Sequence, residues 1–133
     1  MKKFFAIAIT AAMMILCSCA SKNNVNMEGQ WVITNACGVS TVGGDSEAFI
    51  EFDGKGKING NATVNTFFGS YSTKGDSLTF GTMGMTLMLG QSMEMETAIT
   101  KALNSTATVK VENDEATIFN KDGESVMTLK RKK

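Results

Sequence analysis

Hydrophobic and polar residues alternate along most of the chain after residue 27, with the period of a β-strand that has one buried and one solvent-facing side. Turn-forming residues interrupt this alternation at short intervals, for example at Asp53-Gly54 and Lys121-Asp122-Gly123. The pattern predicts a mostly β domain of the α+β class, built on an antiparallel sheet of about seven or eight strands. We expect these strands at residues 29–34, 48–52, 56–61, 66–73, 77–80, 106–112, 115–120 and 125–130.

One segment follows the helical period instead. Its apolar residues fall at spacings of i, i+3, i+4, i+7 and i+8, which predicts one α-helix over about residues 92–104, packed against the sheet. Ser92 is the expected N-cap, and Glu94 suits the first turn because a carboxylate there interacts favourably with the helix dipole. The apolar stripe consists of Met95, Ala98, Ile99, Ala102 and Leu103.

The N-terminus has the pattern of a secretory signal peptide. Lys2 and Lys3 give a positive start, and residues 4–16 form an apolar run in which Thr10 is the one polar residue. This run is shorter than the roughly 20 residues that a membrane-spanning helix needs. We therefore expect residues 1–18 to be removed on export rather than to remain in a membrane.

The end of this segment, Leu16-Cys17-Ser18-Cys19, resembles the lipobox of bacterial lipoproteins. The resemblance implies cleavage before Cys19, which becomes the first mature residue and carries the lipids. Cys17 fits the motif less well, because Leu16 then occupies the position where a small residue is needed. Residues 19–26 are then a lipidated tether, and residues 27–133 are the folded domain.

The residues after Cys19 indicate the location of the protein. Ala20, in place of Asp, argues against retention in the inner membrane by the usual sorting rule for lipoproteins. Residues 20–23 also lack the acidic cluster that accompanies surface export in some lineages. We expect a protein that is lipid-anchored in the outer membrane and faces the periplasm.

Composition narrows the chemistry. The chain has 13 basic and 13 acidic residues, one basic cluster at residues 130–133, and no histidine. Nucleic acid is therefore not an expected partner, and histidine-based triads and the commonest transition-metal ligand set are excluded. We expect a single-domain monomer without a cofactor. Its basic C-terminus is expected to be frayed and solvated, with contact to anionic lipid headgroups as the alternative.

Cys37 is the one thiol that remains once Cys17 is removed and Cys19 is acylated, so an intramolecular disulfide is excluded in the mature chain. Without a histidine to activate it, Cys37 is expected to be buried or idle; a reactive thiol or an intermolecular disulfide is the alternative. Asp76-Ser77-Leu78 resembles an O-glycosylation sequence of one group of Gram-negative bacteria. We expect a hairpin turn followed by a strand at this place.

A series of motifs along the domain occurs in an order and spacing that resemble the META domain of HslJ-like proteins. The motifs lie at residues 29–31, 65–71, 75–81, 86–88, 93–96, 102–103 and 122–123. The resemblance covers roughly residues 27–130 and implies a small, partly open antiparallel β-barrel with one helix against it. It also implies an envelope protein associated with stress or secretion, often lipid-anchored, without an established catalytic centre.

Structural roles are expected for the motif residues. Asn65 can bond within its own turn, Gly69 permits a close approach or a β-bulge, and Tyr71 can bury its ring while its hydroxyl stays paired. Many relatives carry cysteines at the positions of Val64 and Gly90; if these cysteines pair there, packing replaces the covalent link in this chain. The motif residues are Trp31, Asn65, Gly69, Tyr71, Thr86, Met88 and Glu96.

The function that we expect is non-enzymatic. An envelope lipoprotein with this domain would bind or stabilise another envelope component. The first alternative is a protein that binds a small apolar ligand or a lipid at the open end of the barrel. Such a pocket would be lined by Trp31, Phe49, Phe67 and Phe68.

The second alternative is copper(I) binding through thioether sulfurs, with Met83, Met85 and Met88 as the candidate ligands. Ordinary core packing is the competing explanation for these methionines. An enzyme is the third alternative. Acid–base chemistry would need two carboxyl groups held at a defined separation. The pairs Glu51–Asp53 and Glu94–Glu96 are better explained as solvated faces of their elements.

Overall fold

The computed structural model describes residues 23–133. The predicted signal peptide at residues 1–18 and the predicted lipidation site Cys19 lie outside the described residues. The described chain forms nine strands and one helix. These elements are β1 (Gly29–Ala36), β2 (Val39–Ser40), β3 (Phe49–Phe52), β4 (Lys57–Asn61), β5 (Thr66–Lys74), β6 (Ser77–Met85), α2 (Met93–Asn104), β7 (Thr108–Glu112), β8 (Glu115–Phe119) and β9 (Ser125–Arg131).

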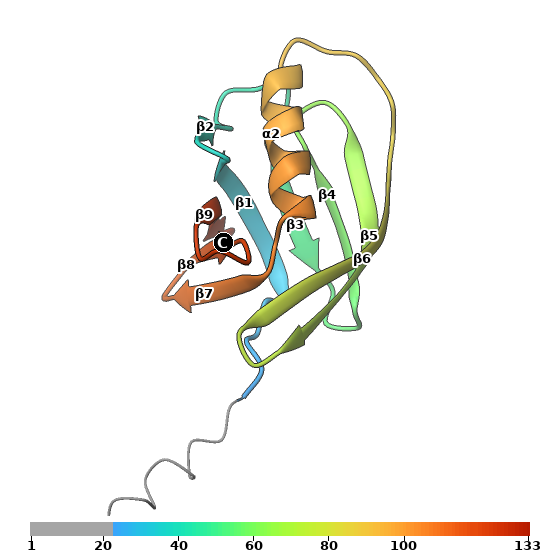
Figure 1. Ribbon diagram of the computed structural model, residues 1–133. Coiled ribbons are helices and arrows are strands. Elements are labelled where there is room, and N and C mark those ends of the chain that lie inside the picture. Colours follow the sequence, from blue (N-terminus) through green and yellow to red (C-terminus); the bar gives the residue numbers. More distant parts are fainter. Residues whose placement is uncertain (1–22) are drawn as a thin grey trace, which may run out of the picture.

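Eight of the strands close into an antiparallel barrel. Their order is β1-β3-β4-β5-β6-β7-β8-β9, and β9 returns to pair with β1, so that Ile33 lies opposite Leu129. The short strand β2 extends the sheet by pairing with the end of β1. Helix α2 packs against β1 in the upper half of the barrel in Figure 1. The predicted mostly β domain, an antiparallel barrel with one packed helix, is confirmed.

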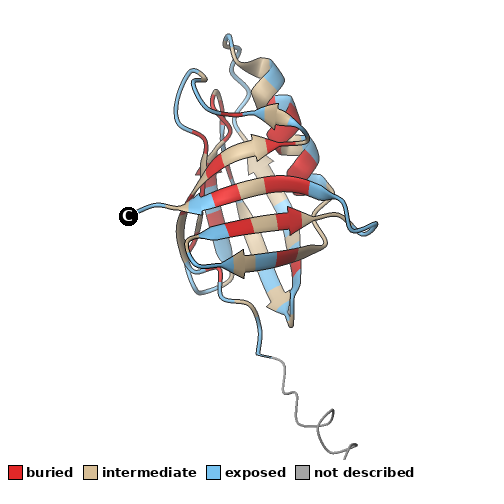
Figure 2. Ribbon diagram, turned by 90° about the vertical axis from the view of Figure 1, so that its left-hand side faces the viewer, coloured by how far each residue is buried: buried red, intermediate tan, exposed pale blue. Residues whose placement is uncertain are grey.

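Alternate residues of the strands fill the interior of the barrel (Figure 2). On β3, for example, Ile50 and Phe52 are fully buried, as the alternation predicts. Trp31 on β1 is also fully buried, and its indole N–H donates to the Met27 carbonyl at 2.8 Å. Large aromatic rings therefore occupy the centre of the molecule, and a buried polar N–H is satisfied there by the backbone.

Helix α2 buries the stripe that its period predicts, except that Met95 is half-buried. Ser92 holds the N-cap position, but its side chain makes no capping hydrogen bond and instead bonds Asp45. Among residues 23–133, no helix is long and apolar enough to cross a membrane. The fully buried members of the stripe are Ala98, Ile99, Ala102 and Leu103.

Two pieces of sheet are absent from the sequence prediction. β2 has two residues, too few to establish an alternating pattern. β6 continues to Met85, well beyond the expected end at residue 80, although Gly81 and Gly84 interrupt its alternation. Glycine weakens a strand, but the Phe68 ring on the neighbouring strand β5 lies over Gly84 on the outer face and supplies the missing packing.

The barrel is joined narrowly between β6 and β7. These strands share one residue pair, Ser77 with Thr108, supported by a hydrogen bond from the Leu78 N–H to the Ala107 carbonyl at 3.0 Å. Beyond this pair β6 follows β5, whereas β7 runs along β8. The strands therefore close into a ring, but β6 and β7 are separated along most of their length. This agrees with the partly open barrel that the family resemblance implies.

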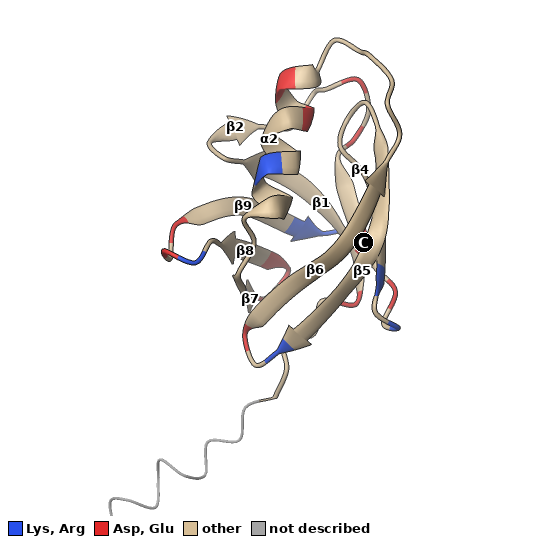
Figure 3. Cartoon of the chain, turned by 45° about the vertical axis from the view of Figure 1, so that its right-hand side comes forward, with Lys and Arg blue, Asp and Glu red and all other residues tan. Residues whose placement is uncertain are grey.

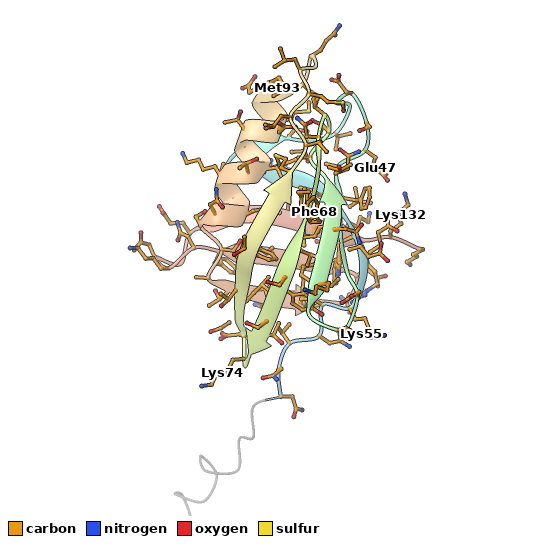
Figure 4. The ribbon with its side chains drawn as sticks, turned by 90° about the vertical axis from the view of Figure 1, so that its right-hand side faces the viewer. Glu47, Lys55, Phe68, Lys74, Met93 and Lys132 are labelled. Atoms are coloured by element: carbon orange, nitrogen blue, oxygen red, sulfur yellow. The ribbon has the colours of Figure 1, made fainter. Side chains whose placement is uncertain are left out.

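Both ends of the described chain contact the barrel. The Val25 N–H donates to the Gly75 carbonyl at 2.8 Å, and the Gly75 N–H donates to the Asn24 side chain at 2.8 Å. These two residues of the expected tether thus lie against the β5–β6 turn. At the other end, β9 extends to Arg131 and the Lys132 N–H donates to the Gln30 carbonyl at 2.9 Å, so the expectation of a frayed C-terminus is wrong up to this residue. The Lys132 amine also lies 2.6 Å from a Glu47 carboxylate oxygen on the surface (Figure 4).

Candidate functional site

Four of the predicted motif residues meet in one hydrogen-bond network, the Asn65 network, which consists of the buried Asn65 and Glu96 and the exposed Thr86 and Met88. Asn65 lies just before β5 and is 1% exposed. Its side-chain oxygen accepts from the Met88 N–H at 2.6 Å and from the Thr86 hydroxyl at 2.8 Å. Its side-chain nitrogen donates to the Met88 carbonyl at 3.0 Å. Both peptide groups of Met88 are therefore held by one side chain.

Glu96 is the acidic member of the Asn65 network and projects from the first turn of α2. It is 7% exposed, and its carboxylate accepts from the Asn65 backbone N–H at 2.8 Å and from the Asn65 side-chain nitrogen at 2.9 and 3.0 Å. The cost of burying the Glu96 carboxylate is offset by these hydrogen bonds and by the position of Glu96 near the helix N-terminus. The expectation that Glu96 shares a solvated face with Glu94 is therefore wrong.

The expectation that Asn65 bonds within its own turn is also wrong. Its side-chain partners lie 21 to 31 residues further along the chain. The unusual backbone conformation in this turn belongs to Thr63, with φ of 77°. Asn65 is thus a long-range connector that joins the start of β5 to the end of β6 and to α2.

The Asn65 network holds the base of an exposed apolar segment, the apolar tip, which consists of Leu87, Met88 and Leu89. Leu87 is 93% exposed, Leu89 is 92% exposed and Met88 is 58% exposed. The tip belongs to the loop between β6 and α2, which arches over the upper end of the barrel in Figure 1. Leu87 and Leu89 are two residues apart and both almost fully exposed, so the tip presents apolar surface to solvent.

A second set of hydrogen bonds holds the other end of this loop. The Asp45 carboxylate accepts from the Ser92 N–H at 2.8 Å, from the Ser92 hydroxyl at 2.5 Å and from the Gln91 N–H at 3.2 Å. These bonds, led by the one from the Ser92 hydroxyl, lower the pKa of Asp45 below its usual value. The apolar tip is therefore attached to the barrel on both sides.

Val64 and Gly90, the positions where many relatives carry cysteines, lie side by side. A Cβ atom placed on Gly90 would be 2.9 Å from the Cγ2 atom of Val64 and 2.7 Å from an Asp45 carboxylate oxygen. The backbone of Gly90 therefore packs closely against the Val64 side chain. This contact also joins the loop to the turn that precedes Asn65.

The four rings expected to line a ligand pocket do not lie together. Trp31 is fully buried and Phe67 is 1% exposed inside the barrel, whereas Phe68 is 58% exposed on the outer face (Figure 4). Phe49 precedes the buried Ile50 and is half-buried. Their alternation along β3 and β5 places these rings on opposite sides of the sheet, so they do not line a common cavity.

The candidate copper ligands are divided in the same way. Met83 and Met85 are half-buried and pack against the hydrophobic core, whereas Met88 is exposed on the apolar tip. Among residues 23–133, no group of three His, Cys, Asp or Glu side chains is arranged to hold a metal ion.

The remaining motif residues shape the barrel near its lower end. The pairing of β5 with β6 shifts register between Gly69 and Tyr71, and a Cβ on Gly69 would lie 2.8 Å from the Thr82 carbonyl oxygen. The Tyr71 ring packs edge-on against Phe52 with centroids 4.8 Å apart, and desolvation raises the pKa of its hydroxyl.

Asp53 accepts from two backbone N–H groups of its turn, which lower its pKa.

Two other sequence candidates lie in turns. Cys37 is a half-buried free cysteine in the β1–β2 turn, with φ of 47°. Ser77 begins β6 directly after the Gly75-Asp76 turn, so the predicted hairpin turn followed by a strand is confirmed. The sequence prediction missed Asp45, Leu87 and Leu89. The signal available for the two leucines was the apolar run at residues 87–89, which lies outside any strand or helix pattern.

Comparisons with known proteins agree with this architecture. The META domain model matches residues 23–133. An NMR structure is similar with a TM-score of 0.63 at 22% identity, over 78% of this chain and 89% of that chain. An NMR structure of a protein from Burkholderia xenovorans has a TM-score of 0.59 at 21% identity, over 79% and 82% of the two chains. A crystal structure of a DUF4847 family protein from Bacteroides vulgatus has a TM-score of 0.61 at 12% identity, over 80% and 94%.

No curated protein matches the chain. At identities of 12 to 22%, the three structures establish a shared fold and nothing about a shared ligand.

Proposed function

Because this chain belongs to the META domain family, we propose that it is a non-catalytic lipoprotein of the cell envelope that binds another envelope protein through its apolar tip. Its lipids are attached at Cys19, and Ala20 directs it to the outer membrane, where the domain faces the periplasm. The protein partner is held or stabilised by contact with Leu87, Met88 and Leu89.

One observation carries this proposal: a single buried side chain, Asn65, bonds both the N–H and the carbonyl of Met88. An apolar loop that is free to move would lose conformational entropy on binding. A loop already held in one shape loses less, so the leucines on either side of Met88 are preorganised for contact. Burying a leucine side chain contributes roughly 1.5–3 kcal/mol.

The geometry of the barrel supports a partner on the side away from the membrane. β6 begins at Ser77, next to the turn that Val25 contacts, and ends at Met85, next to the apolar tip. Nine residues of strand span about 26 Å. The chain from Cys19 to Asn23 can reach at most about 14 Å. A lipid anchor at Cys19 thus holds the β5–β6 turn near the membrane and leaves the apolar tip at the far end of the domain.

Crosslinking in intact cells tests this proposal. The full chain with Leu87→Ser and Leu89→Ser should lose about tenfold or more of its crosslinked partner, because the apolar contact area is removed. Leu87→Met with Leu89→Met is the matched control, since it keeps both side chains apolar and should keep the crosslink. An unchanged crosslink in the serine variant would contradict the role of the tip.

A further inference from the structure

One edge of β6 has no strand beside it for most of its length. β6 pairs with β5 throughout, but it pairs with β7 at Ser77 alone. From Thr79 to Met85, no strand among residues 23–133 covers the edge that faces away from β5. A sheet edge of this kind offers backbone N–H and carbonyl groups to an added strand.

The antiparallel direction of the two strands explains why β6 departs from β7. β7 begins at Thr108, and the chain that precedes it, opposite the rest of β6, forms the helix α2. β6 also contains a β-bulge. Between the pairs Tyr71–Phe80 and Gly69–Met83, β5 has one intervening residue and β6 has two, Gly81 and Thr82. Such an insertion bends the strand and increases its twist. The second half of β6, beyond this bulge, leads to the apolar tip.

This edge lacks most of the features that protect sheet edges from pairing. β6 contains no charged residue and no proline, and Figure 3 shows it without basic or acidic positions along its length. Its protective features are the bulge and the helix α2, which lies across a groove from it. A sheet edge with uncovered backbone groups can bind a partner that adds a strand.

The backbone groups that point outward can be named. The Thr86 N–H donates to the Thr66 carbonyl on the β5 side at 3.1 Å. Because successive residues of a strand direct their backbone groups to opposite edges, Met85 and Met83 direct theirs away from β5. Of these two residues, Met85 lines a groove between β6 and α2.

The groove has a volume of about 650 Å³ and is lined by Met85 together with the side of α2 that bears Thr97, Thr100 and Lys101. The two charged residues that line the groove, Glu96 and Lys101, differ in whether their charge has a partner. The Glu96 carboxylate is engaged by Asn65, whereas Lys101 makes no ion pair among the described residues. The groove therefore combines outward backbone groups, an apolar methionine and one unpaired cation.

We infer that this groove binds an extended segment of the partner protein, which adds to the β6 edge as a strand and places an acidic side chain beside Lys101. The inference rests on the proposed function, and Met85, which lines the groove, lies two residues before Leu87 of the apolar tip. A second copy of this chain does not fit as well, because its own β6 carries β5 beside it. Neighbouring strands lie about 4.8 Å apart, so that β5 would meet α2.

Titration of the domain (residues 23–133) with a defined peptide tests the inference. This segment contains the barrel, the helix and the core. The probe is acetyl-Thr-Val-Glu-Val-Thr-amide. Its control is N-methylated at the glutamate and at both valines, so that neither edge of the peptide can pair as a strand. Millimolar probe should shift the amide NMR signals of Met83 and Met85, and the N-methylated peptide should not.

Variants separate the backbone contribution from the charge. Met85→Pro removes one outward N–H and should weaken binding about threefold to tenfold more than Met85→Ala, which removes the same side chain. Lys101→Glu should weaken binding about twofold to fivefold, with recovery when the peptide carries Lys in place of Glu. Denaturation midpoints establish that each variant is folded.

Three results would overturn the inference: equal binding of the two peptides, shifts confined to residues outside β6 and α2, or shifts that follow protein concentration without peptide, which would indicate pairing between two copies. The titration needs no natural partner. If the serine variant at the tip loses its crosslink but the two peptides bind equally, the groove proposal has failed and the tip proposal stands. If the crosslink is unchanged but the peptides bind as expected, the tip proposal has failed.

Discussion

The side-chain amide of Asn65 takes the place of a neighbouring strand. It bonds the N–H and the carbonyl of Met88 as a paired peptide group would, and its remaining N–H reaches the Glu96 carboxylate. Both the oxygen and the nitrogen of this buried side-chain amide have partners, as buried polar groups require. The same residue thus stabilises the barrel and shapes the tip.

Removal of the Asn65 side chain should be strongly destabilising. Asn65→Ala leaves the Met88 peptide groups without partners and removes side-chain donors from the buried Glu96 carboxylate, which should lower the free energy of unfolding by about 3–5 kcal/mol. Urea denaturation at neutral pH measures this loss. Asn59→Ala, at an exposed position on β4, is the control and should change stability by less than about 0.5 kcal/mol. Similar small effects for both variants would contradict the structural role of Asn65.

Acid should remove the contribution of Asp45. The folded state lowers the pKa of Asp45 below its usual 3.8, so the folded state favours the charged carboxylate. Its stabilising effect is complete above that value and is lost as the pH falls through the lower, folded pKa. The difference in stability between wild type and Asp45→Asn should therefore be constant from pH 7 to about pH 5 and shrink below about pH 3.8. Denaturation midpoints across this range measure it, and a difference that grows on acidification would contradict the assignment.

At the scale of elements, local periodicity was sufficient for the helix and for eight of the nine strands. Residues such as Ile50 and Phe52 alternate with polar neighbours, and the α2 stripe repeats at the helical period, so both signals lie within one segment. The second half of β6 could not be predicted, because its packing at Gly84 comes from Phe68 on another strand. The Asn65 network was hidden for the same reason, since its members are up to 31 residues apart.

The contact between Val64 and Gly90 allows a covalent link to be tested at the two positions where the family resemblance implies cysteines. Val64→Cys with Gly90→Cys should form a disulfide, provided that Asp45 shifts slightly, and closing a loop of this length should stabilise the domain by about 3 kcal/mol. Oxidised and reduced forms of the double variant, compared by urea denaturation, measure the gain. The single variant Val64→Cys is the control for lost packing. Oxidation without a gain in stability would show that the two positions do not fit a disulfide.

At the scale of the whole molecule, the barrel separates two ends. Asn24 and Val25 lie at the β5–β6 turn, and β6 runs from that turn to the apolar tip at the far end. Sequence could indicate a tether and a barrel, but the distance between tether and tip depends on the direction of one strand in the closed sheet. That direction is what places the exposed leucines away from the proposed anchor.

The most direct measurement is the backbone order parameter of Leu87, Met88 and Leu89 from NMR relaxation of the domain. If the Asn65 and Asp45 contacts hold the tip in one shape, these three amides should have values near 0.85, the same as the barrel strands. Values below about 0.6 would mean that the tip moves freely and would contradict a preorganised binding surface.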